Sequence, residues 1–353
     1  MFNPYSITGQ AVRMLILTGG AFFVALLLTP LVTRLLLRYK AGKQIRSSEQ
    51  APVFNQLHQQ KAGTPTMGGI IIWVTVLGIA LVLWGAKTFF GGVFDYFNVV
   101  DRAQTYLPIA AMLIAALLGF VDDLMGIARM GPKGGGMMIR HKLLVYLAIG
   151  LVGAWWFAHK LGWSVLAIPF VGTVEIDGWY VPLFIFIIVA TAFSANETDG
   201  LDGLLGGVSL FSFGSLAVVS FALGRFDLAA FSCMIVGALL AFLWFNIFPA
   251  KFFMGDTGSM ALGITMGVIA MLTNTVLFLP LFAPIFVIES LSVIVQLFSK
   301  KVFKRKIFLS TPIHHHFEAL GWHESRVTMR FWIITAVSNG LGLVLFFLSR
   351  MIK

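Results

Sequence analysis

The sequence predicts an all-α protein that crosses a membrane about ten times, with both chain ends on the extracytoplasmic side. Of its 353 residues, 58% are hydrophobic and only 11% are charged, whereas a soluble domain carries about 25% charged residues. The apolar stretches are long and continuous, as membrane helices of about 20 residues require, and do not alternate as β-barrel strands do. The Lys and Arg residues are also unevenly distributed between the connections, which predicts the orientation.

Ten apolar segments are long enough to span a membrane, although the fifth and the eighth are short. The first lacks a basic segment before it and continues as a full span, so a cleavable signal peptide is not expected. The single cysteine, Cys233, lies inside an apolar segment and excludes a disulfide framework. Without repeats or a soluble insertion, residues 1–353 are expected to form one membrane unit. The expected spans are Met14–Leu37, Gly69–Ala86, Tyr106–Val121, Leu143–Phe157, Val181–Phe193, Leu204–Leu223, Leu228–Ile247, Met260–Leu272, Val276–Phe298 and Phe331–Leu348.

The basic residues orient these spans. Eighteen of the 25 Lys and Arg residues fall in the odd-numbered connections and seven in the others. Because cytoplasmic connections retain excess positive charge, the odd-numbered connections are expected in the cytoplasm. The same bias accounts for the net charge of +10 without a nucleic-acid partner. On the opposite side, the stretch Gly172–Tyr180 alternates between glycines and predicts a small β-hairpin.

The fifth connection concentrates polar residues between two apolar spans. Asn196-Glu-Thr-Asp-Gly-Leu-Asp-Gly203 contains three carboxylates within eight positions. Charged side chains next to hydrocarbon persist where they face a cavity, a cation or a partner. Small glycines and hard oxygen ligands suit a divalent cation that carries phosphates. Taken alone, this stretch is better explained as a polar hairpin between two membrane helices.

Two earlier cytoplasmic connections carry similar residues. The first contains His58, Lys61 and Thr64 in a Gly- and Thr-rich loop. This loop either offers hydrogen-bond donors to a phosphate or is only a flexible loop that leads into the next helix. The third opens with adjacent acids, Asp122 and Asp123, which either share a cation or proton or are ordinary solvated acids. Lys142 follows at the start of the next span.

The seventh and ninth connections complete the set. Phe253-Met-Gly-Asp-Thr-Gly-Ser259 places Asp256 between glycines, before hydroxyls and a helix start whose free N–H groups can face an anion. The ninth connection carries His314-His-His316, which favours phosphate donors over a zinc site because no sulfur accompanies it. Glu289 lies within the ninth span and needs a partner; a structural role is favoured for it.

Acidic and basic side chains from five connections are therefore expected on one membrane face. Carboxylates, cations and Gly-rich turns are what magnesium-dependent phosphoryl transfer requires. Chemistry at a bilayer surface further indicates one water-soluble substrate and one lipid substrate.

These motifs occur in an order that resembles the phospho-N-acetylmuramoyl-pentapeptide-transferase family, within the polyprenyl-phosphate N-acetylhexosamine-1-phosphate transferase superfamily. The similarity covers essentially the whole chain. The matching motifs are His58…Lys61…Gly63-Thr-Pro-Thr-Met-Gly-Gly69, Phe120-Val-Asp-Asp123, Asn196-Glu-Thr-Asp-Gly-Leu-Asp-Gly203, Phe253-Met-Gly-Asp-Thr-Gly-Ser259 and His314-His-His316.

The resemblance implies transfer of phospho-N-acetylmuramoyl-pentapeptide from its UDP-linked donor to undecaprenyl phosphate, giving lipid I and UMP in the first membrane step of peptidoglycan synthesis. It also implies a Mg²⁺ cofactor bound by Asp256, a homodimer, and a bacterial inner (cytoplasmic) membrane protein whose active site faces the cytoplasm. Asp122 and Asp123 would engage the polyprenyl phosphate. The implied catalytic residues are Asp122, Asp123, Asp256 and His314, and the implied substrate-binding residues are Lys61, Thr64, Lys142, Asn196, Asp199, Gly200, Leu201, Asp202, Asn246, Phe253, Ser259, His315 and His316.

One departure and two alternatives accompany this interpretation. Glu197 occupies a position that is usually apolar in the family and adds a charge beside Asp199. A transferase specific for UDP-N-acetylglucosamine would share most of the motifs. A secondary transporter would place more acids near the bilayer midplane and would usually contain repeated halves, neither of which this sequence shows.

Overall fold

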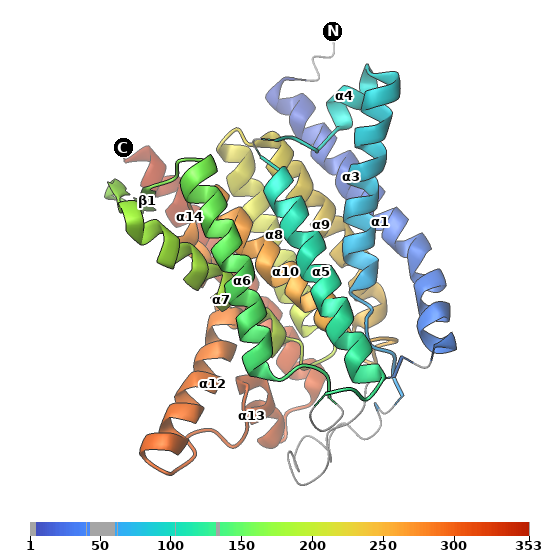
Figure 1. Cartoon of the computed structure of the whole chain (residues 1–353), viewed down its shortest axis with the longest axis vertical. Helices are drawn as coiled ribbons and strands as arrows, with labels where there is room; N and C mark the ends of the chain where they lie inside the picture. The colour runs from blue at the N-terminus through green and yellow to red at the C-terminus, as the bar shows by residue number, and fades with distance from the viewer. Residues whose placement is uncertain are drawn as a thin grey trace.

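The computed structural model describes residues 5–39, 41–42, 61, 63–102, 104–131 and 135–352, and within these ranges the chain is almost entirely helical. Figure 1 shows the helices gathered in one bundle with their axes broadly aligned. The helices and strands are α1 (Ile7–Arg38), α3 (Ile70–Phe90), α4 (Val93–Phe97), α5 (Tyr106–Ile127), α6 (Ile139–Trp155), β1 (Val165–Ile168), β2 (Gly172–Glu175), α7 (Tyr180–Thr198), α8 (Leu204–Ala222), α9 (Phe226–Asn246), α10 (Asp256–Leu272), α11 (Leu279–Phe282), α12 (Pro284–Val302), α13 (Ile313–Ala319) and α14 (Glu324–Met351).

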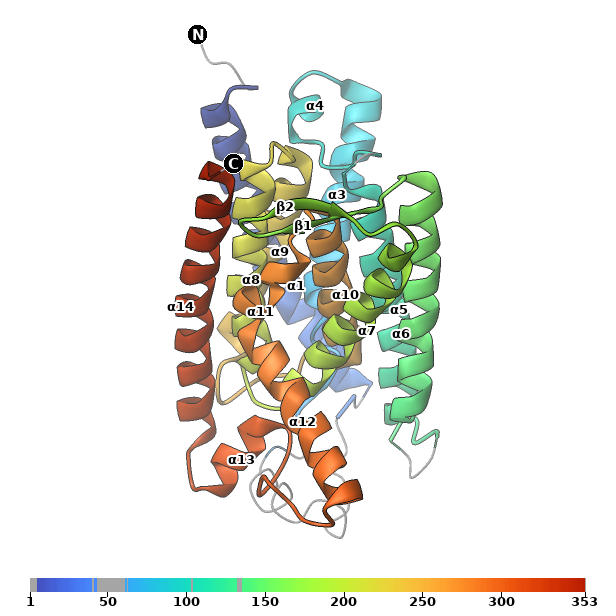
Figure 2. The same ribbon diagram turned by 90° about the vertical axis from the view of Figure 1, so that its left-hand side faces the viewer.

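Eight of the described helices are long and apolar enough to cross a membrane, which confirms a polytopic α-helical membrane protein. Each of the ten expected spans coincides with one of these helices, with α10 or with the α11–α12 pair. Because α10 has 17 residues and the α11–α12 pair is bent by 90°, the count of ten crossings stays a prediction. In Figures 1 and 2, α1 begins and α14 ends at the same end of the bundle.

The ninth expected span, Val276–Phe298, is wrong as a single helix. The chain breaks at Ala283, and α12 leaves at 90° from the preceding segment. Pro280 and Pro284 each lack a backbone N–H, so each is tolerated in a first helical turn and not in a helix interior. In Figure 1, α12 extends away from the bundle, with α13 beside it.

Helix α10 forms the centre of the molecule (Figure 2). Every residue from Thr257 to Leu272 is buried, and α5 and α7 pack against it. Gly, Ala, Ser and Thr are frequent along its sequence, and small residues let membrane helices approach closely. The N-terminus of α10, which begins at Asp256, is therefore fixed by its neighbours on several sides.

The predicted hairpin exists, but its position was only partly right. Strands β1 and β2 pair in antiparallel register from Val165 opposite Glu175 to Ile168 opposite Gly172. The first strand therefore precedes the predicted stretch Gly172–Tyr180, whose last residues turn into α7. The alternating pattern marked one strand, whereas its partner, Val165–Ile168, is a four-residue apolar segment without alternation.

Candidate active site

Two connections distant in sequence are joined by backbone hydrogen bonds at one end of the bundle. Phe253 N donates to Pro65 O over 2.8 Å, and Gly68 N donates to Phe253 O over 2.8 Å. Gly69 N donates to Met254 O over 2.8 Å. This strand-like pairing brings the first and seventh connections together, and it sets the backbone that enters α10.

Asp256, the first residue of α10, is the centre of a polar cluster. Lys142 Nζ lies 2.6 Å from Asp256 Oδ2 and 2.7 Å from Asp122 Oδ2, so one ammonium group bridges two carboxylates. Asn196 donates from Nδ2 to Asp256 Oδ1 and lies 3.4 Å from Ser259 Oγ. The third, fifth and seventh connections thus meet at Asp256, as the sequence predicted.

The two adjacent acids of the third connection have different surroundings. Both belong to the last turns of α5, so their predicted position in a loop was wrong, because the helix continues past the apolar stretch. Asp122 is 2% exposed, and its Oδ1 accepts a hydrogen bond from Met137 N over 2.6 Å. Asp123 instead accepts from the N–H groups of Asp256 (3.1 Å) and Thr257 (3.0 Å). Asp123 therefore caps the N-terminus of α10, where a negative charge is favourable.

The entry to α10 requires a glycine. Gly255 has a positive φ of 75°, and a Cβ there would lie 2.6 Å from Asp123 Oδ2 and 2.8 Å from Thr66 Oγ1. The Gly255 N–H donates to Asp199 Oδ2 over 3.1 Å. A side chain at this position would therefore displace Asp123 and Thr66 from the start of α10.

A second charged cluster surrounds Lys61. Its Nζ lies 2.7 Å from Asp202 Oδ1 and 2.5 Å from Glu324 Oε1. The same Glu324 oxygen accepts from Asp202 N over 2.5 Å, and Asp202 Oδ2 accepts from Ala250 N over 3.0 Å. The Lys61 ammonium also lies 5.7 Å from the centre of the Phe253 ring. Glu324 was missed in the sequence, although a carboxylate at the predicted cytoplasmic start of the last span was an available signal.

Asn246 has a structural part in this second cluster. Its Oδ1 accepts from Gly203 N over 3.0 Å, and its Nδ2 donates to Phe252 O over 2.7 Å. Thr64 lies in the first connection, where its N–H donates to Lys61 O over 3.1 Å. Leu201 is buried.

The three consecutive histidines lie on the short helix α13, and not in an open loop as expected. The three imidazoles have different partners, because neighbouring residues on a helix point in different directions, although the ring centres of His314 and His315 lie 4.1 Å apart. His314 is fully buried, with Nδ1 3.0 Å from Glu289 Oε1. His315 Nδ1 lies 2.6 Å from Glu318 Oε2, and His316 Nδ1 accepts from Leu309 N over 3.2 Å.

Of the three, His314 reaches the acidic connection. A Cβ added to Gly200 would lie 2.1 Å from His314 Nε2, so the imidazole packs directly on the Gly200 backbone. Burial alone would lower the pKa of His314, but the Glu289 carboxylate more than offsets burial, and the pKa is raised. The interior acid Glu289 therefore has a buried imidazole as its partner.

The residues at Asp256 fit a magnesium ion. Among the described residues, no group of three or more His, Cys, Asp or Glu side chains is arranged to hold a metal by itself. Mg²⁺ in phosphate-binding enzymes usually takes only one or two carboxylates, together with water and phosphate oxygens. Asp122 Oδ2 and Asp256 Oδ2 already converge on the ammonium group of Lys142, and the Asp256 side chain is 21% exposed. His58, which belongs to the first of the matched motifs, lies outside the described residues.

Comparisons with known proteins give the class and then the family. The sequence profile described as "Glycosyl transferase family 4" matches residues 105–274, which include Asp122, Lys142, Asn196 and Asp256. Fold and site thus define a membrane-embedded transferase. A profile described as "Phospho-N-acetylmuramoyl-pentapeptide-transferase signature 1" matches residues 61–72.

Relatives similar along nearly the whole chain carry the same name, phospho-N-acetylmuramoyl-pentapeptide-transferase. The protein from Anoxybacillus flavithermus is 38% identical over 94% of this chain and 97% of its own length. The protein from Chloroflexus aurantiacus is 38% identical over 94% of this chain and 89% of its own length. The protein from Clostridium kluyveri is 40% identical over 90% of this chain and 94% of its own length. The chain belongs to the phospho-N-acetylmuramoyl-pentapeptide-transferase family.

Proposed function

We propose that this chain transfers phospho-N-acetylmuramoyl-pentapeptide from its UDP-linked donor to undecaprenyl phosphate, giving lipid I and UMP. The observation that carries the proposal is the convergence of Lys142, Asp122 and Asn196 on Asp256, since these side chains come from four separate segments. Family membership supports the same reaction through the names of the relatives.

In the proposed reaction, a phosphate oxygen of the lipid attacks the phosphorus that bears the sugar. The bond from this phosphorus to the bridging oxygen breaks, and that oxygen leaves with UMP. A phosphate oxygen is already a competent nucleophile, so the attack needs no covalent enzyme intermediate. Mg²⁺ held at Asp256 would neutralise charge on the diphosphate.

The chain's own residues then divide the remaining work. Lys142 balances the charge of Asp122 and Asp256 and supplies a cation to the transferred phosphoryl group. Asp123 holds the N-terminus of α10, and therefore Asp256, in position. His314, which packs on the Gly200 backbone and has a raised pKa, is assigned to the diphosphate or the sugar.

The cluster around Lys61 is the proposed donor-nucleotide end of the site. Lys61, Asp202 and Glu324 form a connected charged group, and Phe253 presents an aromatic ring beside it, against which a base can stack. The residues assigned to this end are Lys61, Thr64, Asp199, Gly200, Leu201, Asp202, Asn246 and Phe253, while Asn196, Ser259, His315 and His316 are assigned to the diphosphate and the sugar.

We further propose that the chain is a homodimer in the bacterial inner membrane, with ten crossings and this site on the cytoplasmic face. The excess of Lys and Arg in the connections at the site end supports that orientation. The whole chain then acts as one catalytic unit.

Release of UMP tests this proposal. Purified protein is incubated with the UDP-linked muramoyl-pentapeptide, and polyprenyl phosphate and Mg²⁺ are each added or withheld. UMP is expected only when both are present. Release without the lipid would contradict a lipid acceptor, and faster turnover of UDP-N-acetylglucosamine would assign the chain a different donor.

A further inference from the structure

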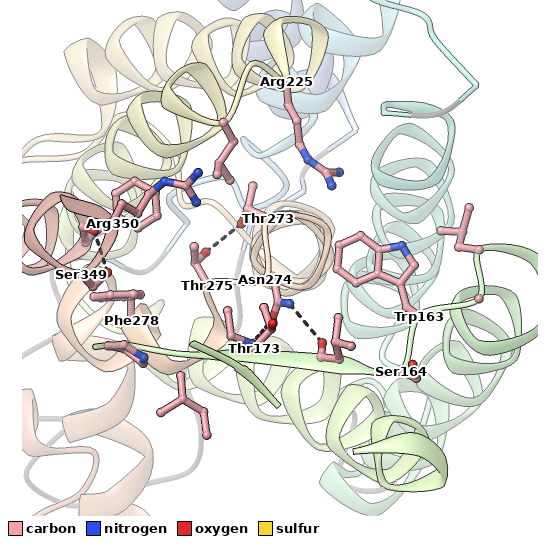
Figure 3. Close-up of a pocket in the computed structure, with 18 residues that line it drawn as sticks. Trp163, Ser164, Thr173, Arg225, Thr273, Asn274, Thr275, Phe278, Ser349 and Arg350 are labelled. Carbon is pink, nitrogen blue, oxygen red and sulfur yellow. Dashed lines mark hydrogen bonds between the residues drawn. The ribbon is translucent and has the colours of Figure 1, made fainter. Parts of the chain in front are cut away.

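A second pocket lies at the opposite end of the bundle from Asp256. It has a volume of about 480 Å³ and is bounded by the β1–β2 hairpin, the end of α10, the α8–α9 turn and the last turns of α14. Figure 3 shows polar and aromatic side chains from these separate elements turned toward it. The proposed transferase reaction does not use this pocket.

The hairpin is held over the pocket by one side chain. Asn274 follows the end of α10 with a positive φ of 53°. Its Oδ1 accepts from Ala167 N over 3.0 Å, and its Nδ2 donates to Val165 O over 3.1 Å. Because the Asn274 amide both accepts a hydrogen bond from β1 and donates one to it, the hairpin is held in place as one wall of the pocket.

Two arginines line the pocket without an acidic partner. Among the described residues, neither Arg225 nor Arg350 forms an ion pair with a carboxylate, in contrast to Arg13, whose Nη2 lies 2.6 Å from Asp227 Oδ1. Arg225 lies 5.5 Å from the Trp163 ring centre, and burial lowers the pKa of its guanidinium. A half-buried positive charge without a counter-charge favours an anion.

The remaining walls are partly hydroxylic and partly apolar. Thr273 and Thr275 are joined by a 2.7 Å hydrogen bond between their hydroxyls. Figure 3 shows the Arg225 and Arg350 guanidinium groups on either side of Thr273. Phe278 and Phe346 form the apolar part of the lining, with their ring centres 5.8 Å apart. The pocket thus combines a cationic part with an aromatic part.

We propose that this pocket binds the phosphate of an anionic amphiphile, with the phosphate at Arg225 and Arg350 and the apolar portion against Phe278 and Phe346. The planar guanidinium matches phosphate geometry and forms paired, charge-assisted hydrogen bonds. Both arginines lie at the ends of membrane-spanning helices, the depth at which lipid headgroups occur. A phospholipid headgroup or a free phosphate group would satisfy the same chemistry.

Titration of the purified full-length chain with short-chain lipids tests the site. Binding of phosphatidylglycerol, phosphatidylcholine and inorganic phosphate is measured by native mass spectrometry. The test protein is the double variant Arg225→Gln/Arg350→Gln. Arg102→Gln is the control, because Arg102 is an exposed arginine at the same end of the bundle outside this pocket. The double variant is expected to bind phosphatidylglycerol roughly tenfold more weakly, and the control is expected to bind it unchanged.

A second variant separates charge from folding. Arg225→Lys/Arg350→Lys keeps both charges and is expected to retain most of the preference for phosphatidylglycerol over phosphatidylcholine. Competition by inorganic phosphate would identify the phosphate group itself as sufficient; its absence would assign the site to a lipid headgroup. Equal binding of the two lipids by the wild-type chain would overturn the proposal. Unchanged phosphatidylglycerol binding in the Gln double variant would also overturn it. The same holds if the Lys double variant prefers phosphatidylglycerol no more than the Gln double variant does.

Discussion

The buried pair of His314 and Glu289 gives the sharpest test of how the site is held together. Both side chains are fully buried, and neither has another hydrogen-bond partner among the described residues. Removing one member of a buried ion pair leaves an uncompensated charge and costs about 3–5 kcal/mol. Glu289→Gln keeps the shape of the side chain and an acceptor oxygen, so a loss of about 2–3 kcal/mol is expected.

The pH dependence of stability follows from the raised pKa of His314. A histidine whose pKa is higher in the folded state contributes stability below its unfolded value of 6.5, and this contribution is lost as the pH rises through the folded value. In Glu289→Gln the carboxylate that raises the pKa of His314 most is gone, so His314 loses its proton at a lower pH than in the wild type. The difference in stability between wild type and this variant is therefore expected to shrink at alkaline pH.

A double-mutant cycle measures the pair directly. Thermal unfolding midpoints in detergent are compared for the wild type, Glu289→Gln, His314→Gln and the double variant. The matched control is the cycle of His315 and Glu318, which lie 2.6 Å apart on the same short helix. A coupling of about 1–3 kcal/mol is expected for the buried pair, and a smaller coupling is expected for the control, whose imidazole is partly exposed. Additive effects at His314 and Glu289, at every pH, would refute the proposed electrostatic linkage.

Three further substitutions probe other parts of the site. Asp123→Asn removes the charge that caps α10 and should lower stability by about 1–2 kcal/mol; an unchanged unfolding midpoint would argue against a capping role. Gly200→Ala places a Cβ 2.1 Å from His314 Nε2 and should reduce turnover, whereas Gly214→Ala, with open space around its Cβ, should leave turnover unchanged. Equal activities would contradict this packing. Glu324→Gln should raise the KM for the nucleotide donor about tenfold by weakening the Lys61 cluster; a change in kcat alone would assign Glu324 elsewhere.

Much of the molecule could be predicted because apolar length and charge distribution are local properties of a sequence. The helices around Tyr106, Leu204 and Phe226 follow directly from uninterrupted apolar runs. The break at Ala283 was missed because hydropathy does not report the direction of a helix axis. Pro284 was nevertheless recognisable in the sequence as a residue that starts helices. The end of α5 was placed too early because the apolar segment stops at the acidic residues, whereas the helix continues past them.

The candidate site was predictable as a set of residues and not as a set of contacts. Asp122 and Asp123 are adjacent and chemically identical, yet one faces Lys142 and the other caps α10. That difference depends on the direction of α5 relative to α10, which no local pattern encodes. The pairing of Glu289 on α12 with His314 on α13 joins residues 25 positions apart across the connection between these two helices, and it likewise required the structure.

The proposed function requires that side chains from separate connections form one site around Asp256. It is tested most directly by UMP release from the nucleotide donor in the Asp256→Ala variant, measured with polyprenyl phosphate across a range of Mg²⁺ concentrations. This variant is expected to stay folded, with an unfolding midpoint close to that of the wild type, and to release no UMP above background at any Mg²⁺ concentration. Wild-type rates with wild-type Mg²⁺ dependence would contradict it.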